Sequence, residues 1–174
     1  MSLLVLAYPQ LDSKDYNWIQ SYRSKHDGRY YNLFQPHFTI VFPVKDINQE
    51  HFIKHVENVS GGFYKFSFVL MCAIPVKDSF SDYTDLFLVP EEGYSIFIKL
   101  HDSMYNGLLE KELRFDIPFI PHVGIANSLD PFESKKLADE LNNSEKLEIR
   151  GTINKLEVVT YESNSINTLK IIVL

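Results

Sequence analysis

Apolar residues along the chain follow two spacings, one typical of short strands and the other of amphipathic helices. Strand-like runs lie near residues 3–8, 37–42, 63–74, 83–89, 119–126, 149–161 and 166–173. Helical spacing predicts helices over 14–26, 49–59 and 93–113, and a last helix that begins after Asp130. That last helix has the clearest start, with Asp130 as N-cap, Pro131 as first helical residue and Glu133 at the capping-box position.

The order of these predicted elements repeats once. Strand, helix, proline-histidine strand, helix and strand describe residues 3–74 and then residues 83–161. Residues 76–82 lie between the two series and form a loop by composition. The pattern therefore predicts one bilobed domain over 1–174, with lobe one at about 1–76, lobe two at about 77–174, and a pseudo-twofold axis between them.

Composition limits the classes of partner. A chain of 174 residues with 45% hydrophobic content can bury one sizeable core. Its formal net charge of -6 argues against attraction to a long nucleic acid, which requires clustered Lys and Arg, but leaves a nucleotide or short oligonucleotide as a partner. The single cysteine, Cys72, can form no internal disulfide. Without an apparent leader or membrane-spanning segment, we expect a cytoplasmic monomer with no membrane association.

Two proline-led histidines open strand-like runs of similar pattern, PHFTI at 36–40 and PHVGI at 121–125. Side chains alternate along a strand, so His37 shares one face with Thr39, and His122 shares one face with Gly124. If the two strands are neighbours, both imidazoles face one cleft. Each histidine alone could equally be an ordinary surface or hydrogen-bonded residue, and Thr39 could be β-branched strand filler.

The paired motifs resemble the signature of the two-histidine (2H) phosphoesterase superfamily, which includes LigT-like 2′-5′ RNA ligases and cyclic phosphodiesterases. That signature is histidine, any residue, threonine or serine, then a hydrophobic residue. Residues 37–40 match it fully, whereas Gly124 replaces the hydroxyl residue in the second motif. The resemblance implies an α+β, bilobed LigT-like fold, with two antiparallel sheets and outer helices around a central cleft. It also implies that His37 and His122 are catalytic, with Thr39 and Gly124 at the substrate phosphate.

The chemistry of a phosphodiester suits such a pair. Opening a 2′,3′-cyclic phosphate or breaking a 2′-5′ linkage needs a base for the attacking oxygen and an acid for the departing one. Imidazole has an unperturbed pKa of about 6.5, so at pH 7 one ring can be neutral and the other protonated without large tuning. Thr39 can donate its hydroxyl to a non-bridging phosphate oxygen. No metal and no other cofactor is needed, and His122 is the favoured base.

Other residues leave alternatives open. Gly124 either weakens the site or makes room for a larger ligand, so a nucleotide-binding or regulatory protein with a weakened 2H site is the rival hypothesis. The basic and aromatic stretch that includes Arg29, Tyr30 and Tyr31 could contact a nucleotide, or could be solvated loop. His51 and His55 have the i, i+4 spacing of zinc ligands but lack the glutamate of the His-Glu-x-x-His motif, so an exposed helix face explains them better.

Overall fold

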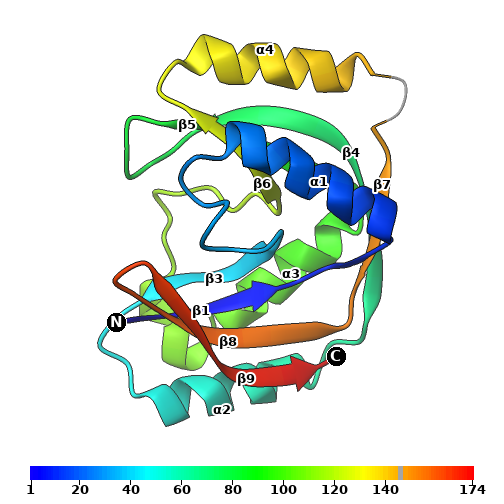
Figure 1. Ribbon diagram of the computed structural model, residues 1–174. Helices are drawn as coiled ribbons and strands as arrows, with labels where there is room; N and C mark the ends of the chain where they lie inside the picture. Colours follow the sequence, from blue (N-terminus) through cyan, green and yellow to red (C-terminus); the bar gives the residue numbers. More distant parts are fainter. Residues whose placement is uncertain (145–146) are drawn as a thin grey trace.

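Two antiparallel sheets form the framework of the computed structural model, which describes residues 1–144 and 147–174 (Figure 1). The first sheet has the order β3-β1-β8-β9, with β1 (Ser2–Ala7), β3 (Phe38–Val44), β8 (Lys155–Glu162) and β9 (Ser165–Val173). The second has the order β2-β7-β4-β5-β6, with β2 (Gln10–Leu11), β4 (Phe66–Lys77), β5 (Thr84–Glu92), β6 (Val123–Ser128) and β7 (Ile149–Ile153). This arrangement confirms the predicted α+β fold class.

Four helices pack against the sheets. The helix α2 (Gln49–Ser60) contacts the first sheet, α1 (Ser13–His26) and α4 (Pro131–Asn142) contact the second, and α3 (Tyr94–Met104) contacts both. The predicted start of α4 is confirmed, since the Asp130 side chain accepts a hydrogen bond from the Phe132 amide and Pro131 follows it. Glu133 does not close a capping box, because its carboxylate accepts from the Ser128 hydroxyl instead. No helix of the described residues is long and apolar enough to cross a membrane.

Two predicted elements are each divided in the structure. The helix predicted over 93–113 ends at Met104, and a separate 3₁₀ turn covers Gly107–Glu112. The break lies directly before Gly107, whose φ of +59° could not continue the α-helix. The strand predicted over 149–161 is β7 and β8, which pair with β4 and β1 respectively, so the chain passes from one sheet to the other at Asn154.

The expected boundary near residue 76 does not separate the two sheets. Residues 76–82 belong to the hairpin that joins β4 to β5, closed by a hydrogen bond from the Asp78 amide to the Tyr83 carbonyl. The first sheet instead pairs β1 with both β3 and β8, which come from opposite ends of the chain. The division into lobes at about 1–76 and 77–174 is therefore wrong at the level of strand pairing, because hydrophobic pattern does not specify which strands pair.

Aromatic rings join the two sheets in one main core. Phe38 of β3 stacks on Phe97 of α3 with ring centroids 4.2 Å apart, and contacts Phe68 of β4 at 5.0 Å. A smaller apolar cluster, with Leu4, Leu6 and Val159 at its centre, is separate from the main core. Because Leu4 and Leu6 alternate with the main-core residues Leu3 and Val5 along β1, this cluster lies on the opposite face of the first sheet.

Candidate functional site

The two predicted histidines occupy equivalent positions in the two sheets. His37 directly precedes β3 and His122 directly precedes β6. The following residues, Phe38 and Val123, are buried at 1% and 0% exposure, whereas both histidines remain partly exposed. The predicted alternation along both motifs is confirmed, with one face of each strand in the core and the other turned away from it.

Both imidazoles are oriented by the same kind of hydrogen bond. Nδ1 of His37 lies 2.8 Å from the carbonyl oxygen of Gln35, and Nδ1 of His122 lies 2.6 Å from that of Ile120. A carbonyl can only accept, so Nδ1 carries the hydrogen in each ring. In the neutral ring the lone pair is then on Nε2, which is free to accept a proton.

The surroundings lower the pKa of both histidines. Burial lowers the pKa of His37 to about 4 and that of His122 to about 4. The charge of His37 lowers the pKa of His122 further, so the two rings lie within electrostatic reach of each other. Both rings are therefore neutral at pH 7 in the free protein. The expectation that one ring can be protonated at pH 7 without a large shift in pKa is wrong for the free protein, because the sequence does not show how strongly the rings are desolvated.

Different rings surround the two histidines. Phe87 of β5 stacks on His122, with centroids 3.5 Å apart and planes 11° apart. His37 contacts Phe34 at 4.8 Å and Tyr8 at 5.9 Å. Each imidazole thus contacts at least one aromatic ring, which adds to its desolvation.

The residues two positions after each histidine also differ. Thr39 pairs with Leu6 across β1 and β3, on the face of the smaller apolar cluster, and its hydroxyl has no hydrogen-bond partner among the described residues. Gly124 pairs with Phe87, and a Cβ atom added there would meet no atom within 4 Å. The first motif thus offers a free hydroxyl donor, and the second offers open space.

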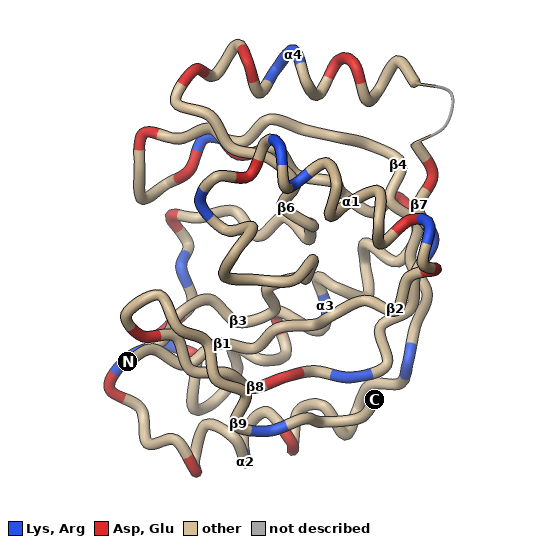
Figure 2. Tube along the Cα trace, in the orientation of Figure 1, with Lys and Arg blue, Asp and Glu red and all other residues tan. Residues whose placement is uncertain are grey.

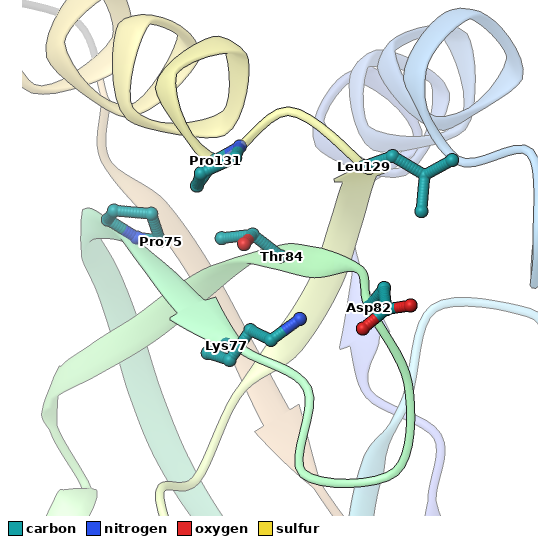
Figure 3. Close-up of a pocket in the computed structure, with 6 residues that line it drawn as sticks. All are labelled: Pro75, Lys77, Asp82, Thr84, Leu129 and Pro131. Carbon is teal, nitrogen blue, oxygen red and sulfur yellow. The ribbon is translucent and has the colours of Figure 1, made fainter.

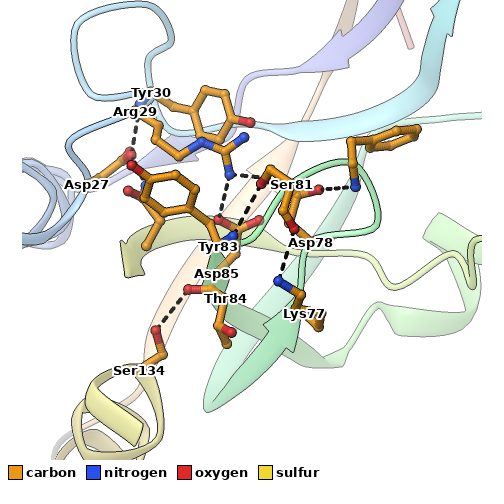
Figure 4. Close-up of polar contacts among 12 residues, drawn as sticks. Asp27, Arg29, Tyr30, Lys77, Asp78, Ser81, Tyr83, Thr84, Asp85 and Ser134 are labelled. Atoms are coloured by element: carbon orange, nitrogen blue, oxygen red, sulfur yellow. Dashed lines mark hydrogen bonds and ion pairs between the residues drawn. The ribbon is translucent and has the colours of Figure 1, made fainter. Parts of the chain in front are cut away.

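Arg29 is committed to an internal ion pair (Figure 4). Its Nη1 donates to Oδ2 of Asp78 at 2.8 Å and lies 3.6 Å from Oδ1 of Asp85. The guanidinium also lies 4.7 Å from the ring centroid of Tyr30 and 4.5 Å from that of Tyr83. These contacts tie the segment before His37 to the β4–β5 hairpin, and they do not support the predicted role of Arg29 in binding a nucleotide.

The two tyrosines after Arg29 have different surroundings. Tyr31 lies 5.9 Å from the guanidinium of the buried Arg23. Tyr30 lies edge-on to Phe34 at 6.3 Å, and Phe34 in turn contacts His37. Of the three predicted nucleotide contacts, Tyr30 is therefore the one connected to the histidine through ring contacts.

A buried ion pair that the sequence analysis did not predict positions the segment before His37. Arg23 lies in α1, Asp27 is the C-cap of that helix, and their side chains are 2% and 4% exposed. Nε and Nη2 of Arg23 donate to Oδ2 of Asp27. Arg23 also donates to the Phe34 carbonyl at 2.8 Å, and Asp27 accepts from Asn127 of β6 at 2.6 Å. The pair links the His37 segment to the strand that follows His122. The i, i+4 spacing of Arg23 and Asp27 is the sequence pattern that could have indicated this ion pair.

His51 and His55, which have the i, i+4 spacing of zinc ligands, do not form a metal site with the other described residues. Nε2 of His55 lies 2.7 Å from the carbonyl oxygen of Met104, so this nitrogen is occupied by an interhelical contact. Across residues 1–144 and 147–174, no group of three or more His, Cys, Asp or Glu side chains could hold a metal ion. The contact with Met104 accounts for His55 as a structural residue.

A surface hollow of about 470 Å³ lies away from the histidines. It is lined by Pro75, Lys77, Asp82, Thr84, Leu129 and Pro131 (Figure 3). These residues come from the β4–β5 hairpin and the start of α4. The hollow is open to solvent and carries no histidine, so it is not the site that the two motifs form.

Two sheets that each place one histidine immediately before a strand define the class of a two-histidine phosphoesterase. Residues 11–165 match the family model of the 2'-5' RNA ligase superfamily, and the chain belongs to that superfamily. A Bacillus licheniformis protein, whose name assigns it provisionally to the phosphoesterases, is 28% identical over 115 residues. That match covers 65% of this chain and 64% of the relative, so the chain spans just under two thirds of that relative's length.

Solved structures of related shape confirm the predicted LigT-like fold. TT0787 of Thermus thermophilus has a TM-score of 0.62 at 13% identity, over 100% of this chain and 98% of that chain. LigT of E. coli in its apo form has a TM-score of 0.56 at 15% identity, over 99% and 96%. LigT of E. coli complexed with ATP has a TM-score of 0.58 at 13% identity, over 99% and 97%. At these identities the likeness shows the fold alone.

Proposed function

We propose that the protein is a metal-independent phosphoesterase that acts on a nucleotide-like phosphodiester, a 2′,3′-cyclic phosphate or a 2′-5′ linkage. The observation that carries this proposal is the matched pair His37 and His122, each with Nδ1 fixed by a backbone carbonyl and Nε2 left free. LigT of E. coli, which shares the fold, has been crystallised with ATP, 3'-AMP and NADP+, and this supports a nucleotide ligand.

In hydrolysis, one histidine takes a proton and the other gives one. Nε2 of the base removes a proton from the attacking water as its oxygen bonds to phosphorus, and the protonated acid donates its proton to the oxygen whose bond to phosphorus breaks. We assign His122 as base and His37 as acid, because the charge of His37 lowers the pKa of His122 and so favours the neutral form of that ring.

Binding of the substrate phosphate changes the pKa values of the two histidines. An anionic phosphate between the rings raises their pKa values from about 4, so that one ring can hold a proton once substrate is bound. Thr39 donates its hydroxyl to a non-bridging oxygen and stabilises the charge that develops there. Gly124 offers no second donor.

A second candidate is a nucleotide-binding protein without turnover. It is favoured by the missing hydroxyl at Gly124, since loss of one oriented donor can reduce a rate by about 10²–10³. Measurable, saturable binding of a nucleotide that forms no product would support this candidate.

The test is a screen of 2′,3′-cyclic nucleotides, 2′-5′ oligonucleotides and cyclic dinucleotides, with product analysis and exhaustive chelation of metals. Product formed in the presence of chelator supports the proposal. Binding without product supports the second candidate instead. Activity that vanishes on chelation and returns with zinc would overturn the metal-independent mechanism and direct attention to His51 and His55.

A further inference from the structure

The helix that precedes each histidine contacts the strand that follows the other histidine. The helix α1 precedes His37 in the chain and contacts β6, the strand after His122. The helix α3 precedes His122 and contacts β3, the strand after His37. Residues 30–44 and 117–128, which include both histidines and both strands, carry no Lys, Arg, Asp or Glu (Figure 2). Any charged side chain that holds these segments therefore comes from another element.

One such contact runs from the segment before His37 to β6. Nη1 of Arg23 donates to the Phe34 carbonyl at 2.8 Å, and Oδ1 of Asp27 accepts from Nδ2 of Asn127 at 2.6 Å. Arg23 and Asp27 are buried and paired with each other, so they join Phe34 to the strand after the other histidine. We refer to Arg23, Asp27 and Asn127 as the α1 brace.

A matching contact runs from the segment before His122 to β3. His101 of α3 is 2% exposed, and its Nδ1 donates to the Ile40 carbonyl at 2.8 Å. Its ring stacks on Phe119, with centroids 3.6 Å apart and planes 4° apart. We refer to His101 and Phe119 as the α3 brace. Phe119 lies three residues before His122, as Phe34 does before His37.

Both braces end next to the carbonyl that orients an imidazole. Phe34 directly precedes Gln35, whose carbonyl accepts from one catalytic ring, and Phe119 directly precedes Ile120, whose carbonyl accepts from the other. The two rings belong to different sheets, and each brace joins a segment of one sheet to a strand of the other. A shift of either brace would therefore move one imidazole relative to its partner.

We propose that the two braces position the acid–base pair, with Arg23, Asp27 and Asn127 on one side and His101 on the other holding the imidazoles at the separation that proton transfer needs. Proton transfer depends steeply on such placement, and a misplacement of 1 Å can reduce a rate by about 10²-fold. These are positioning residues, because each acts through a neighbouring segment. The inference rests on the proposed function, since the pair that the braces align is the proposed catalytic pair.

One substitution in each brace tests this role. His101→Phe keeps a ring to stack on Phe119 and loses the donor to Ile40. Asn127→Ala loses the donor to Asp27 and leaves the buried ion pair of α1 in place. On the substrate that the screen identifies, each should reduce kcat by about 10- to 100-fold with little change in KM, because alignment acts on the chemical step.

Two control variants remove hydrogen bonds of the same kind elsewhere. Tyr105→Phe keeps the ring and loses the hydroxyl that accepts from the Phe42 amide, a contact within the first sheet and its helix. Asn142→Ala loses two hydrogen bonds to the Ala73 backbone, which join α4 to β4. Both should lower the melting temperature and leave kcat as in the wild-type protein, with all rates measured well below the melting temperature of each variant.

A second measurement needs no turnover. Beyond the effect of burial, the charge of His37 lowers the pKa of His122, so His37→Ala should raise that pKa in an NMR titration. The size of the rise reports how closely the two rings are held, since the interaction between charges falls with distance. The rise should be smaller when His37→Ala is made in the Asn127→Ala or His101→Phe protein.

The outcomes separate this inference from the proposed function. If the wild-type protein turns over no compound of the screen, the proposed function fails and the NMR titrations alone decide whether the braces set the separation. Wild-type kcat in both folded brace variants, an equal fall of kcat in the two controls, or an unchanged rise in the pKa of His122 would overturn the inference. If melting curves show that a brace variant fails to fold, His101→Asn, which loses the ring, or Asn127→Ser, which has a shorter side chain, takes its place.

Discussion

Phe87 and His122 lie face to face, with ring centroids 3.5 Å apart and planes 11° apart. The phenyl ring shields one face of the imidazole from water and so disfavours its protonated form. We predict that Phe87→Leu raises the pKa of His122 from about 4 toward the ordinary value of about 6.5. NMR titration of the imidazole signals measures this directly.

Phe42→Leu is the control, because Phe42 contacts His101 and Phe119 and neither proposed catalytic histidine. It should leave the titration of His122 as in the wild-type protein. If the titration of His122 is also unchanged in Phe87→Leu, the ring is not a cause of the lowered pKa.

The pH dependence of the wild-type enzyme should differ between kcat/KM and kcat. With both histidine pKa values at about 4, the free enzyme loses its singly protonated form as pH rises above 4, so kcat/KM should fall from acid toward neutral pH. The bound phosphate raises these pKa values, so the optimum of kcat should lie at higher pH. Rates measured from pH 3.5 to 8.5 test this, and a common optimum near pH 7 for both quantities would contradict the lowered pKa values.

Local features of the fold could be predicted from the sequence, whereas strand partners could not. The alternation around His37 and His122 and the cap at Asp130 depend on neighbouring residues, and both are confirmed. The pairing of β1 with β8 depends on tertiary contacts between the two ends of the chain. For the same reason, composition alone could not distinguish the hairpin at 76–82 from a junction between lobes.

The site shows the same division. The motifs singled out the two histidines, but the ion pair between Arg29 and Asp78, which does not support the predicted nucleotide contact of Arg29, joins residues far apart in sequence and could not be predicted. The packing of Tyr8 and Tyr161 on the smaller apolar cluster beside His37 exists only after β1 and β8 have come together. The low pKa values follow from burial, which a sequence pattern does not measure.

Gly124→Thr tests what the glycine contributes. The added Cβ meets no atom within 4 Å, so the variant should fold normally. If the glycine records a lost phosphate donor, kcat on a small cyclic nucleotide should rise by up to about tenfold, for about 1.4 kcal/mol of transition-state stabilisation. If it makes room for a larger ligand, affinity for the larger substrates of the screen should fall instead.

Gly124→Ala is the matched control, since it adds the Cβ without the hydroxyl. A gain in kcat that appears with threonine and not with alanine assigns the effect to the hydroxyl. No change in rate or affinity with either residue would mean that position 124 does not face the phosphate, and would remove Gly124 from the site.

Asp85 is a partly buried carboxylate whose removal should stabilise the protein at neutral pH. Desolvation raises its pKa to about 6, and its Oδ1 atom has no hydrogen-bond partner among the described residues. A raised pKa means that ionisation of Asp85 costs stability as pH rises from about 4 through 6. We therefore compare the free energies of unfolding of Asp85→Asn and wild type. Their difference should shift by about 1–3 kcal/mol in favour of the variant between pH 4 and pH 8.

Urea unfolding at the two pH values measures that difference. Asp82→Asn, a neighbour on the same hairpin, is the control and should show no comparable change. A destabilisation of Asp85→Asn that grows toward pH 8 would mean that the 3.6 Å ion pair with Arg29 outweighs desolvation.

The most direct measurement of the central claim is a double-mutant cycle on the two histidines. His37→Ala, His122→Ala and the double variant are compared in kcat/KM on the substrate that the screen identifies, with His51→Ala as control and melting curves for each. Because the pair acts as one proton-transfer unit, each single change should reduce the rate by about 10²–10⁴, and the double change should cost little more than either single change. Full wild-type turnover in either folded single variant, or losses that simply multiply in the double variant, would contradict a shared site.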